Sequence, residues 1–528
     1  MCVVELFDGS YDGDNPEGVN MSERSSVIFN NKISNKVYKK AVKNRKKLVK
    51  KFGDDSSMTY PLMITENPIL SPFIGVKNIG VDHNLSNDTT EVPKNKSRKV
   101  TNLNPQPEFD ENSLVVGNIR MGFGHYRISM AIASAAYHMG YTPYWYDLHS
   151  FETTTGGKVI SHLNDLYSFG SRLSQKYSLF NKFYWEPLNS EGFKKLSYNA
   201  MDQEMSKLMT PAFRQLPKQI PYIATHVWPA QAAVHAGVEK VVNVIPDNWP
   251  MALHLAEGSI HTVQTPSAYL GYRTLKNMSK SRINHPMSAN DIVMTGHYVD
   301  HELVENIKAD NEKRLKRLNV GGAKRFLITV GGAGAQKEIF VEIIRKLLPA
   351  IRKNKEVLYL NVGDHFSVWE DLIHDIPELK EQTQTYFDKW EDTVSFANGA
   401  LTNEVSGIHA FYHKDVYAAV YSTNLLIRSS DVLITKPSEL SFYPIPKLLI
   451  KRVGGHEAWG AVRSAEIGDG TLECETKELT LQMLDLLLNE EDILTQMCHN
   501  INKANEIGVY DGAYKAVALA TGFEGEYK

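Results

Sequence analysis

A pattern of buried strand, glycine turn and helix occurs twice in this chain of 528 residues, and it constrains the fold more than any other feature. The first copy covers 113–140, where SLVVGNI is predicted as a strand, MGFGH as a turn and the following residues as a helix that stops at Gly140. The second copy starts at Lys324 with KRFLITV, the turn GGAGAQ and another helix. Such units assemble into parallel sheets covered by helices. The chain is therefore predicted to be α/β, with two Rossmann-like, doubly wound domains facing a cleft.

Composition and the spacing of apolar residues divide the chain into four regions. Asn, Ser, Asp and Lys are common before Ser113, and the apolar periods there are short. Short apolar runs, each followed by a polar turn, continue the first domain, and a charged stretch precedes the second copy of the pattern. We expect an N-terminal extension (1–112), a first α/β domain (113–305), a second α/β domain (306–505) and a C-terminal segment (506–528) whose helix can return to the first domain.

The extension contains a basic segment, residues 31–51, with ten Lys or Arg residues and no acid. The formal net charge of −3 for the whole chain hides this asymmetry. Ile33, Val37, Ala41 and Leu48 fall close to one helical face, with lysines around it. Such a helix can lie on an anionic membrane surface, bind nucleic acid without sequence specificity, or simply be solvated.

Membrane insertion and secretion are not expected. No window approaches the roughly 20 apolar residues that a membrane-spanning helix needs. The start MCVVELFDGSYDGDNPEG lacks the basic flank and apolar core of a signal peptide. We expect a cytoplasmic protein, with the basic segment allowing peripheral contact with the inner face of the membrane.

Both glycine turns are candidate anion sites, because free backbone N–H groups and the helix dipole coincide at a helix start. In the first turn, Gly117 and Gly122 have the spacing of a phosphate-binding P-loop, but Phe123 stands where that loop needs a lysine. His125, beside the helix start, could take a proton from a substrate hydroxyl, hold a phosphate oxygen, or be structural.

The second turn suits a diphosphate better than the first. Its glycines let the backbone approach a pyrophosphate, and its last side chain can donate a hydrogen bond; the residues are Gly331, Gly332, Gly334 and Gln336. Two polar turns follow later strands, at Lys436, Ser438 and Glu439 and at Gly455, His456 and Glu457. The carboxylate of Glu439 could accept hydrogen bonds from both hydroxyls of a ribose.

The order of these motifs resembles that of GT-B glycosyltransferases in the branch of monogalactosyldiacylglycerol synthases, processive diacylglycerol glucosyltransferases and the peptidoglycan GlcNAc transferase. The resemblance runs from about Val115 to the C-terminus. The matching pieces are Gly122–His125, Thr225-His226, Val244–Asp247, Thr295–His297, Gly331–Gly334, Val362–His365, Thr435-Lys436 and Gly455–Glu457.

The resemblance implies an inverting, metal-independent hexosyltransferase. A nucleotide-sugar, most simply a UDP-sugar, would be the substrate and no cofactor would be needed. The ribose would lie near Glu439 and the sugar near His456 and Glu457. His125 or Asp247 would act as base, while helix dipoles and backbone N–H groups would do the work of a metal.

The acceptor side and the partners also follow from the resemblance. Gly122, Gly124 and His226 would bind the acceptor, and the basic segment favours a lipid or membrane-associated one. No specific nucleic-acid partner is expected, and nothing is implied about the oligomeric state.

Two alternatives remain open on the same fold. One is a non-hydrolysing UDP-sugar 2-epimerase, and the other is a nucleotide-sugar binding protein without transfer activity. The second alternative is plausible because only eight residues, PSELSFYP, separate Lys436 from Ile445. The family carries a glycine loop and a full helix there.

Overall fold

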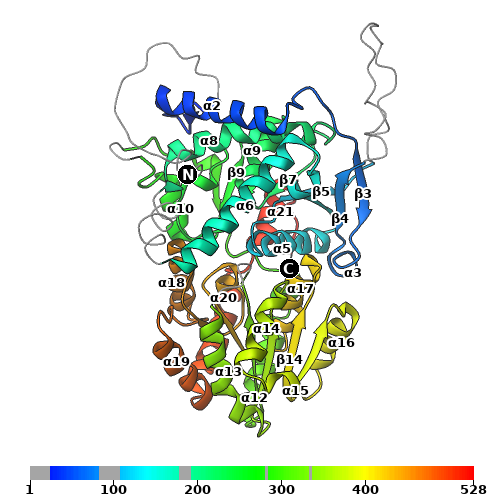
Figure 1. Ribbon diagram of the computed structural model, residues 1–528, viewed down its shortest axis with the longest axis vertical. Helices are drawn as coiled ribbons and strands as arrows, with labels where there is room; N and C mark the ends of the chain where they lie inside the picture. Colours follow the sequence, from blue (N-terminus) through cyan, green and yellow to red (C-terminus); the bar gives the residue numbers. More distant parts are fainter. Residues whose placement is uncertain (1–23, 83–107, 178–191, 280–282, 332–335, 528) are drawn as a thin grey trace. The chain divides into compact units, whose positions relative to one another are not determined.

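A computed structural model of the chain describes residues 24–82, 108–177, 192–279, 283–331 and 336–527. These residues form two compact units (Figure 1). The first unit comprises the chain up to Met121, 133–294 and 514–527; the second comprises 122–132 and 295–513. Each unit has its own largely parallel sheet and its own apolar core. The predicted α/β fold with two doubly wound units is thereby confirmed.

The first unit is built on an eight-stranded sheet in the order β10-β9-β8-β7-β5-β6-β4-β3. Its strands are β3 (Leu62–Glu66), β4 (Lys77–Val81), β5 (Ser113–Asn118), β6 (Thr142–Asp147), β7 (Tyr222–Ala224), β8 (Val241–Val244), β9 (Ile260–Val263) and β10 (Ile292–Met294). All neighbours are parallel except β3, which is antiparallel to β4. Every residue of β5 is buried, as expected for a central parallel strand covered on both faces.

The order of strands reverses between β5 and β7. The chain leaves β5 for β6 on one side and later returns to β7 on the other, so β5 and β7 flank the switch point of the sheet. The helices of this unit include α2 (Asn35–Phe52), α6 (Thr155–Lys176), α8 (Leu196–Ser206), α9 (Val227–His235), α10 (Pro266–Arg273) and α21 (Gly512–Thr521). Helix α5 (Gly124–His138) begins in residues assigned to the second unit.

The segment predicted as an extension supplies part of this unit. β3 and β4 form the edge of the sheet, and α2 lies along α8 (Figure 1). Ser34 caps α2 by accepting a hydrogen bond from the N–H of Val37 at 3.4 Å. Leu48, Val49 and Phe52 pack against the core, so the apolar face of α2 is used inside the unit.

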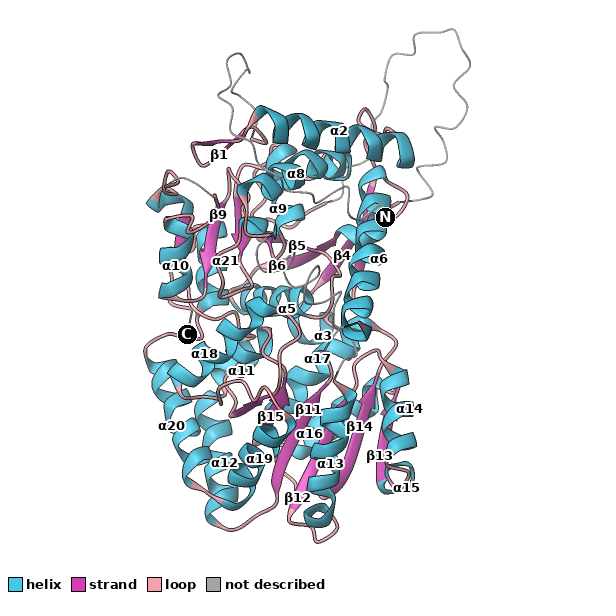
Figure 2. Cartoon of the chain, turned by 60° about the vertical axis from the view of Figure 1, so that its left-hand side comes forward, coloured by secondary structure: helices cyan, strands magenta, loops and turns pink. Residues whose placement is uncertain are grey.

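The second unit has a six-stranded, wholly parallel sheet in the order β13-β14-β12-β11-β15-β16. Its strands are β11 (Lys324–Thr329), β12 (Glu356–Asn361), β13 (Thr383–Phe387), β14 (Gly407–Tyr412), β15 (Val432–Thr435) and β16 (Lys447–Leu449). Its helices include α12 (Ile307–Asn319), α13 (Lys337–Ile351), α14 (Phe366–Asp375), α16 (Trp390–Ala400), α17 (Val416–Ile427), α18 (Ala458–Ile467), α19 (Lys477–Asn489) and α20 (Asp492–Glu506). Figure 2 shows the strands side by side with helices packed beside them.

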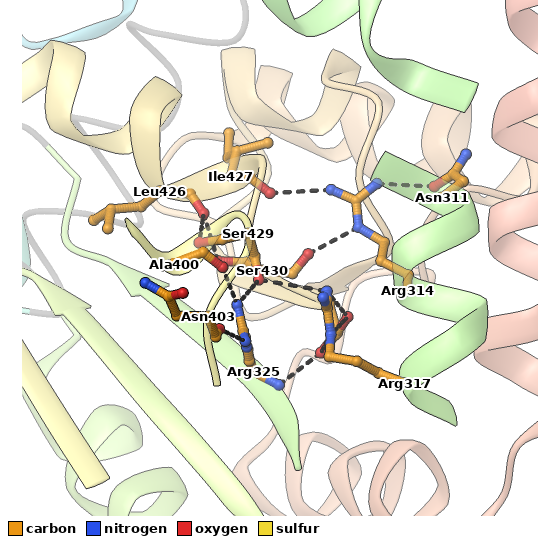
Figure 3. A network of polar contacts seen from close by, with 11 residues as sticks. Asn311, Arg314, Arg317, Arg325, Ala400, Asn403, Leu426, Ile427, Ser429 and Ser430 are labelled. Carbon is orange, nitrogen blue, oxygen red and sulfur yellow. Dashed lines mark hydrogen bonds and ion pairs between the residues drawn. The ribbon is translucent and has the colours of Figure 1, made fainter. Parts of the chain in front are cut away.

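Three arginines stabilise this unit at the amino ends of β11 and β15 (Figure 3). Arg314 is buried and donates to the carbonyls of Ile427 and Ser430, at 3.0 and 2.8 Å. Arg317 pairs with Asp431 at 2.6 Å, and Arg325 donates from its backbone to the same carboxylate. Cations suit the carbonyl-rich end of α17. This network lies at the amino ends of the strands, whereas the candidate functional site lies at their carboxyl ends.

No helix in the part of the chain that the structure describes is long and apolar enough to cross a membrane.

Candidate functional site

The predicted donor residues gather at the switch point of the second sheet. The chain leaves β11 for β12 on one side and returns to β15 on the other. Gly331 and Gln336 follow β11, while Lys436, Ser438 and Glu439 follow β15. Ligands of open parallel sheets bind at the carboxyl ends of the strands beside such a switch point. Gly332 and Gly334 lie outside the described residues.

The side chain of Lys436 packs against Gly331, which follows β11. A side chain on Gly331 would start 3.1 Å from Cε of Lys436, so the glycine leaves room for the lysine stem. Gln336 precedes α13 in the left-handed region, with a φ of 76°, and its side-chain amide donates to the carbonyl of Lys451. Gln336 thus ties the start of α13 to the turn after β16.

Lys436 forms an ion pair with Glu457, and both side chains are largely buried, at 16% and 11% exposed. The other oxygen of Glu457 accepts from the N–H groups of Val453 and Gly454 at 2.8 and 3.1 Å. Burial by itself would raise the pKa of Glu457, but Lys436, His456 and these hydrogen bonds together bring that pKa below its usual value. Glu457 is therefore ionised at neutral pH.

The neighbouring predicted residues lie in two short turns. Gly455, His456 and Glu457 form one 3₁₀ turn, and the imidazole of His456 packs on Gly454, where a side chain would start 2.7 Å from its Cε1. Ser438 precedes a second 3₁₀ turn, Glu439–Phe442, and its backbone N–H donates to the hydroxyl of Ser441 at 3.2 Å. The eight residues between Lys436 and Ile445 thus hold a compact capped turn.

The glycine-histidine start of α5 belongs to the second unit by its contacts. The ring of Phe123 packs on Gly363 and lies 5.8 Å from the ring of His365. A side chain on Gly124 would start 1.9 Å from a carboxylate oxygen of Glu439, so this position admits only glycine while Glu439 stays in place. Gly122 has a φ of +79°, which favours glycine. His125 is half-buried and follows directly in the first turn of α5.

Arg127 is a further residue of this region that the sequence did not single out. Its guanidinium is buried and donates to the carbonyl of Val420 and the hydroxyl of Thr423, at 3.4 and 3.2 Å. Burial lowers the pKa of Arg127, while the nearby acidic groups of Tyr443, Glu439 and Asp300 oppose that shift. Arg127 therefore holds the start of α5 on α17.

The buried carboxyl group of Asp300 lies near Arg127 and is affected by its charge. Burial raises the pKa of Asp300 to about 7, although the Tyr443 hydroxyl donates to this group at 3.1 Å and Arg127 favours its ionised form. Neither interaction fully offsets the loss of water around the carboxyl.

Asp247 lies in the first unit, after β8, and makes a close pair with a histidine. Nε2 of His254 lies 2.9 Å from Oδ2 of Asp247. The carboxylate is the more exposed member, at 24% against 7% for the imidazole. The side chain of Asn243 donates to the carbonyl of His254 at 2.7 Å, which ties the histidine to β8. The pair places a carboxylate and an imidazole, two kinds of group that serve as general bases, after β8 in the first sheet.

His226, the predicted acceptor-binding residue, caps helix α9. Its Nδ1 lies 3.1 Å from the N–H of Trp228. Because a backbone N–H can only donate, Nδ1 accepts, and a neutral ring then carries its proton on Nε2. His226 and Asp247 belong to the first unit, whereas the other predicted site residues that the structure describes belong to the second.

Comparison with known proteins gives the following matches. Residues 27–274 match a family model described as "Domain of unknown function (DUF6937)", and residues 287–521 match one described as "Domain of unknown function (DUF6938)". No curated protein matches the chain.

Several solved structures are similar to the chain at low identity. A UDP-GlcNAc 2-epimerase from Neisseria meningitidis bound to UDP-GlcNAc is 11% identical with a TM-score of 0.39, over 77% of this chain and 97% of that one. A trehalose-6-phosphate protein from E. coli bound with UDP-2-fluoro glucose gives 11% and 0.38, over 78% and 99%. A glycosyltransferase from Rickettsia africae gives 13% and 0.35, over 78% and 97%. All three TM-scores lie below 0.5, and the fold class of this chain rests on its own two sheets.

Proposed function

We propose that this protein is an inverting glycosyltransferase that moves a sugar from a nucleotide-sugar, most simply a UDP-sugar, to a lipid or membrane-associated acceptor. The observation that carries the proposal is the contact of Gly331 with Lys436 at the switch point between β11 and β15, with Glu439 three residues after Lys436. The glycine-histidine start of α5 lies beside them, because Gly124 contacts Glu439. Together these groups offer a cation, two helix starts and a candidate base to one substrate.

In the proposed reaction, the acceptor oxygen forms a bond to the anomeric carbon of the sugar while the bond from that carbon to the nucleoside diphosphate breaks. The proton of the acceptor hydroxyl passes to His125 or to Asp247. The departing diphosphate gains negative charge, which Lys436 and the start of α13 would stabilise. Since Asp247 pairs with His254, a proton taken up there would be held by two groups.

Thermal stabilisation by nucleotide-sugars tests the donor part of the proposal. A ligand present at about 100 times its Kd stabilises the folded state by about 2.7 kcal/mol. UDP-sugars are therefore expected to raise the Tm more than GDP- or ADP-sugars in a matched series. Stabilisation with conversion of the bound sugar at its second carbon would favour the epimerase alternative. No stabilisation by any nucleotide-sugar would contradict the proposed function.

The membrane part of the proposal rests on the outward face of α2. Seven lysines of α2 are exposed, and five of them fall three or four residues apart and therefore on one side of the helix: Lys36, Lys39, Lys43, Lys46 and Lys50. Because the opposite, apolar face packs inside the first unit, binding to a bilayer would be electrostatic and not by insertion. Each lysine near an anionic surface contributes about 1 kcal/mol.

Changing these five lysines to glutamine is expected to abolish sedimentation with phosphatidylserine-containing vesicles. Wild-type binding should also fall as salt is added, because salt screens exposed charges. The matched control changes five exposed lysines of the second unit to glutamine: Lys308, Lys353, Lys355, Lys380 and Lys414. Equal sedimentation of wild type and the α2 variant would contradict the membrane proposal, as would equal loss in both variants.

A further inference from the structure

The ion pair between Lys436 and Glu457 resembles a phosphate-binding site in which the Glu457 carboxylate takes the place of the phosphate. One oxygen of the Glu457 carboxylate pairs with the Lys436 ammonium, and the other accepts from two successive backbone N–H groups, those of Val453 and Gly454. A lysine together with backbone N–H groups of a tight turn is also the donor set by which proteins bind phosphate oxygens. The carboxylate therefore satisfies the donors that an incoming diphosphate would need.

We propose that Glu457 is an internal anion that competes with the donor diphosphate for Lys436, so that nucleotide binding requires Glu457 to leave. This inference rests on the proposed function, since it concerns the same site. Lys436 is placed for the purpose, because its stem crosses Gly331 at the end of β11. The diphosphate expected at the start of α13 would thus meet Lys436 already paired.

Displacement fits the chemistry of the pair better than protonation. The lowered pKa of Glu457 means that the group stays charged at neutral pH, so a diphosphate and Glu457 would repel each other if both remained. A glutamate side chain has three rotatable bonds and can swing away without a change in the backbone. The displaced carboxylate would then be free to accept hydrogen bonds from hydroxyls of the bound sugar.

The neighbouring cation of the same turn provides a comparison. Arg452 pairs with Glu473, and the N–H of Arg452 also donates to Glu473 at 2.9 Å. This pair follows β16 as well, but Gly331 lies against Lys436 and not against Arg452. Glu473→Gln therefore removes a similar carboxylate charge close by without freeing Lys436.

Titration calorimetry with UDP and with inorganic pyrophosphate tests the inference on the full chain. Glu457→Gln and Glu457→Ala are each expected to tighten both ligands about tenfold, which corresponds to about 1.4 kcal/mol. Glu473→Gln should bind within about twofold of wild type. Lys436→Met should lose binding of both ligands. The Tm of each variant reports whether it is folded.

Other outcomes separate this inference from the proposed function. Unchanged or weaker binding of UDP and pyrophosphate by both Glu457 variants overturns the inference, even if wild type binds UDP-sugars. Weaker binding of UDP-sugar with unchanged UDP would make Glu457 a sugar ligand alone, and this also overturns it. Tighter pyrophosphate without binding of any nucleotide supports the internal competitor while contradicting the proposed function.

Discussion

Replacing His125 with alanine is expected to slow sugar transfer about 10²- to 10⁴-fold, which is the usual contribution of a positioned general base. The affinity for UDP should change by less than about twofold, because the donor groups follow β11 and β15 and remain intact. His125 follows Gly124, which contacts Glu439. His125 is therefore attached close to the residues after β15 where the donor is proposed to bind. The measurement is the initial rate of transfer at saturating donor.

His138 provides the matched control for this variant. It lies at the last turn of the same helix and is exposed, so His138→Ala removes the same side chain far along α5 from the start. Its transfer rate should stay within about twofold of wild type. Full activity of His125→Ala would rule out a role as base. If Asp247→Asn then lost activity, the pair of Asp247 and His254 would be the base instead.

Replacing Lys447 with methionine is expected to lower the free energy of unfolding of the second unit by about 3–5 kcal/mol, the usual cost of leaving a buried charge unpaired. Lys447 and Asp469 are both 0% exposed and lie 2.9 Å apart. Burial lowers the pKa of Lys447, and Asp469 opposes that shift. The lysine also donates to the carbonyls of Tyr443 and Ile445, and both carbonyls would lose this hydrogen bond.

Urea denaturation of the full chain measures this loss, with an exposed ion pair as control. Lys346 and Asp485 lie 2.7 Å apart but are 41% and 45% exposed. Lys346→Met should therefore cost less than about 1 kcal/mol. The double variant Lys447→Met with Asp469→Asn should recover part of the stability, because no charge is then left buried alone. Similar losses of unfolding free energy in Lys447→Met and Lys346→Met would contradict the claim that burial makes the Lys447–Asp469 pair costly to break.

The sequence predicted the architecture where apolar runs were continuous. β5, β11, β12 and β15 are buried along nearly their whole length, and each was visible as a short apolar run before a turn. β3 was missed because it lies at the sheet edge, where only Leu62 of its five residues is buried. β13 was missed for the same reason.

The extension could not be assigned to the first unit from its composition. The basic segment was recognised as an amphipathic helix, but whether its apolar face met a membrane or a protein depended on α8, which lies more than 140 residues later. The presence of partly buried apolar residues along α2 shows that the face is used within the unit.

The site was only partly predictable because its pairs join distant turns. Lys436 and Glu457 were both singled out, yet their pairing depends on the parallel alignment of β15 and β16. His254 was missed because it reaches Asp247 through a 3₁₀ turn that leaves no periodic signal. Arg127 was hidden in a helix of small apolar residues, and its partners on α17 are almost 300 positions away.

Transfer of a labelled sugar into lipid tests the central claim most directly. The full chain would be incubated with UDP-sugars labelled in the sugar and with diacylglycerol in phosphatidylserine-containing vesicles, followed by extraction of the lipid phase. The account predicts that label from one donor enters the lipid, that UDP appears in equal amount, and that Lys436→Met abolishes both. Stable binding of UDP-sugars with all label left in the aqueous phase, for every sugar and lipid tried, would contradict it.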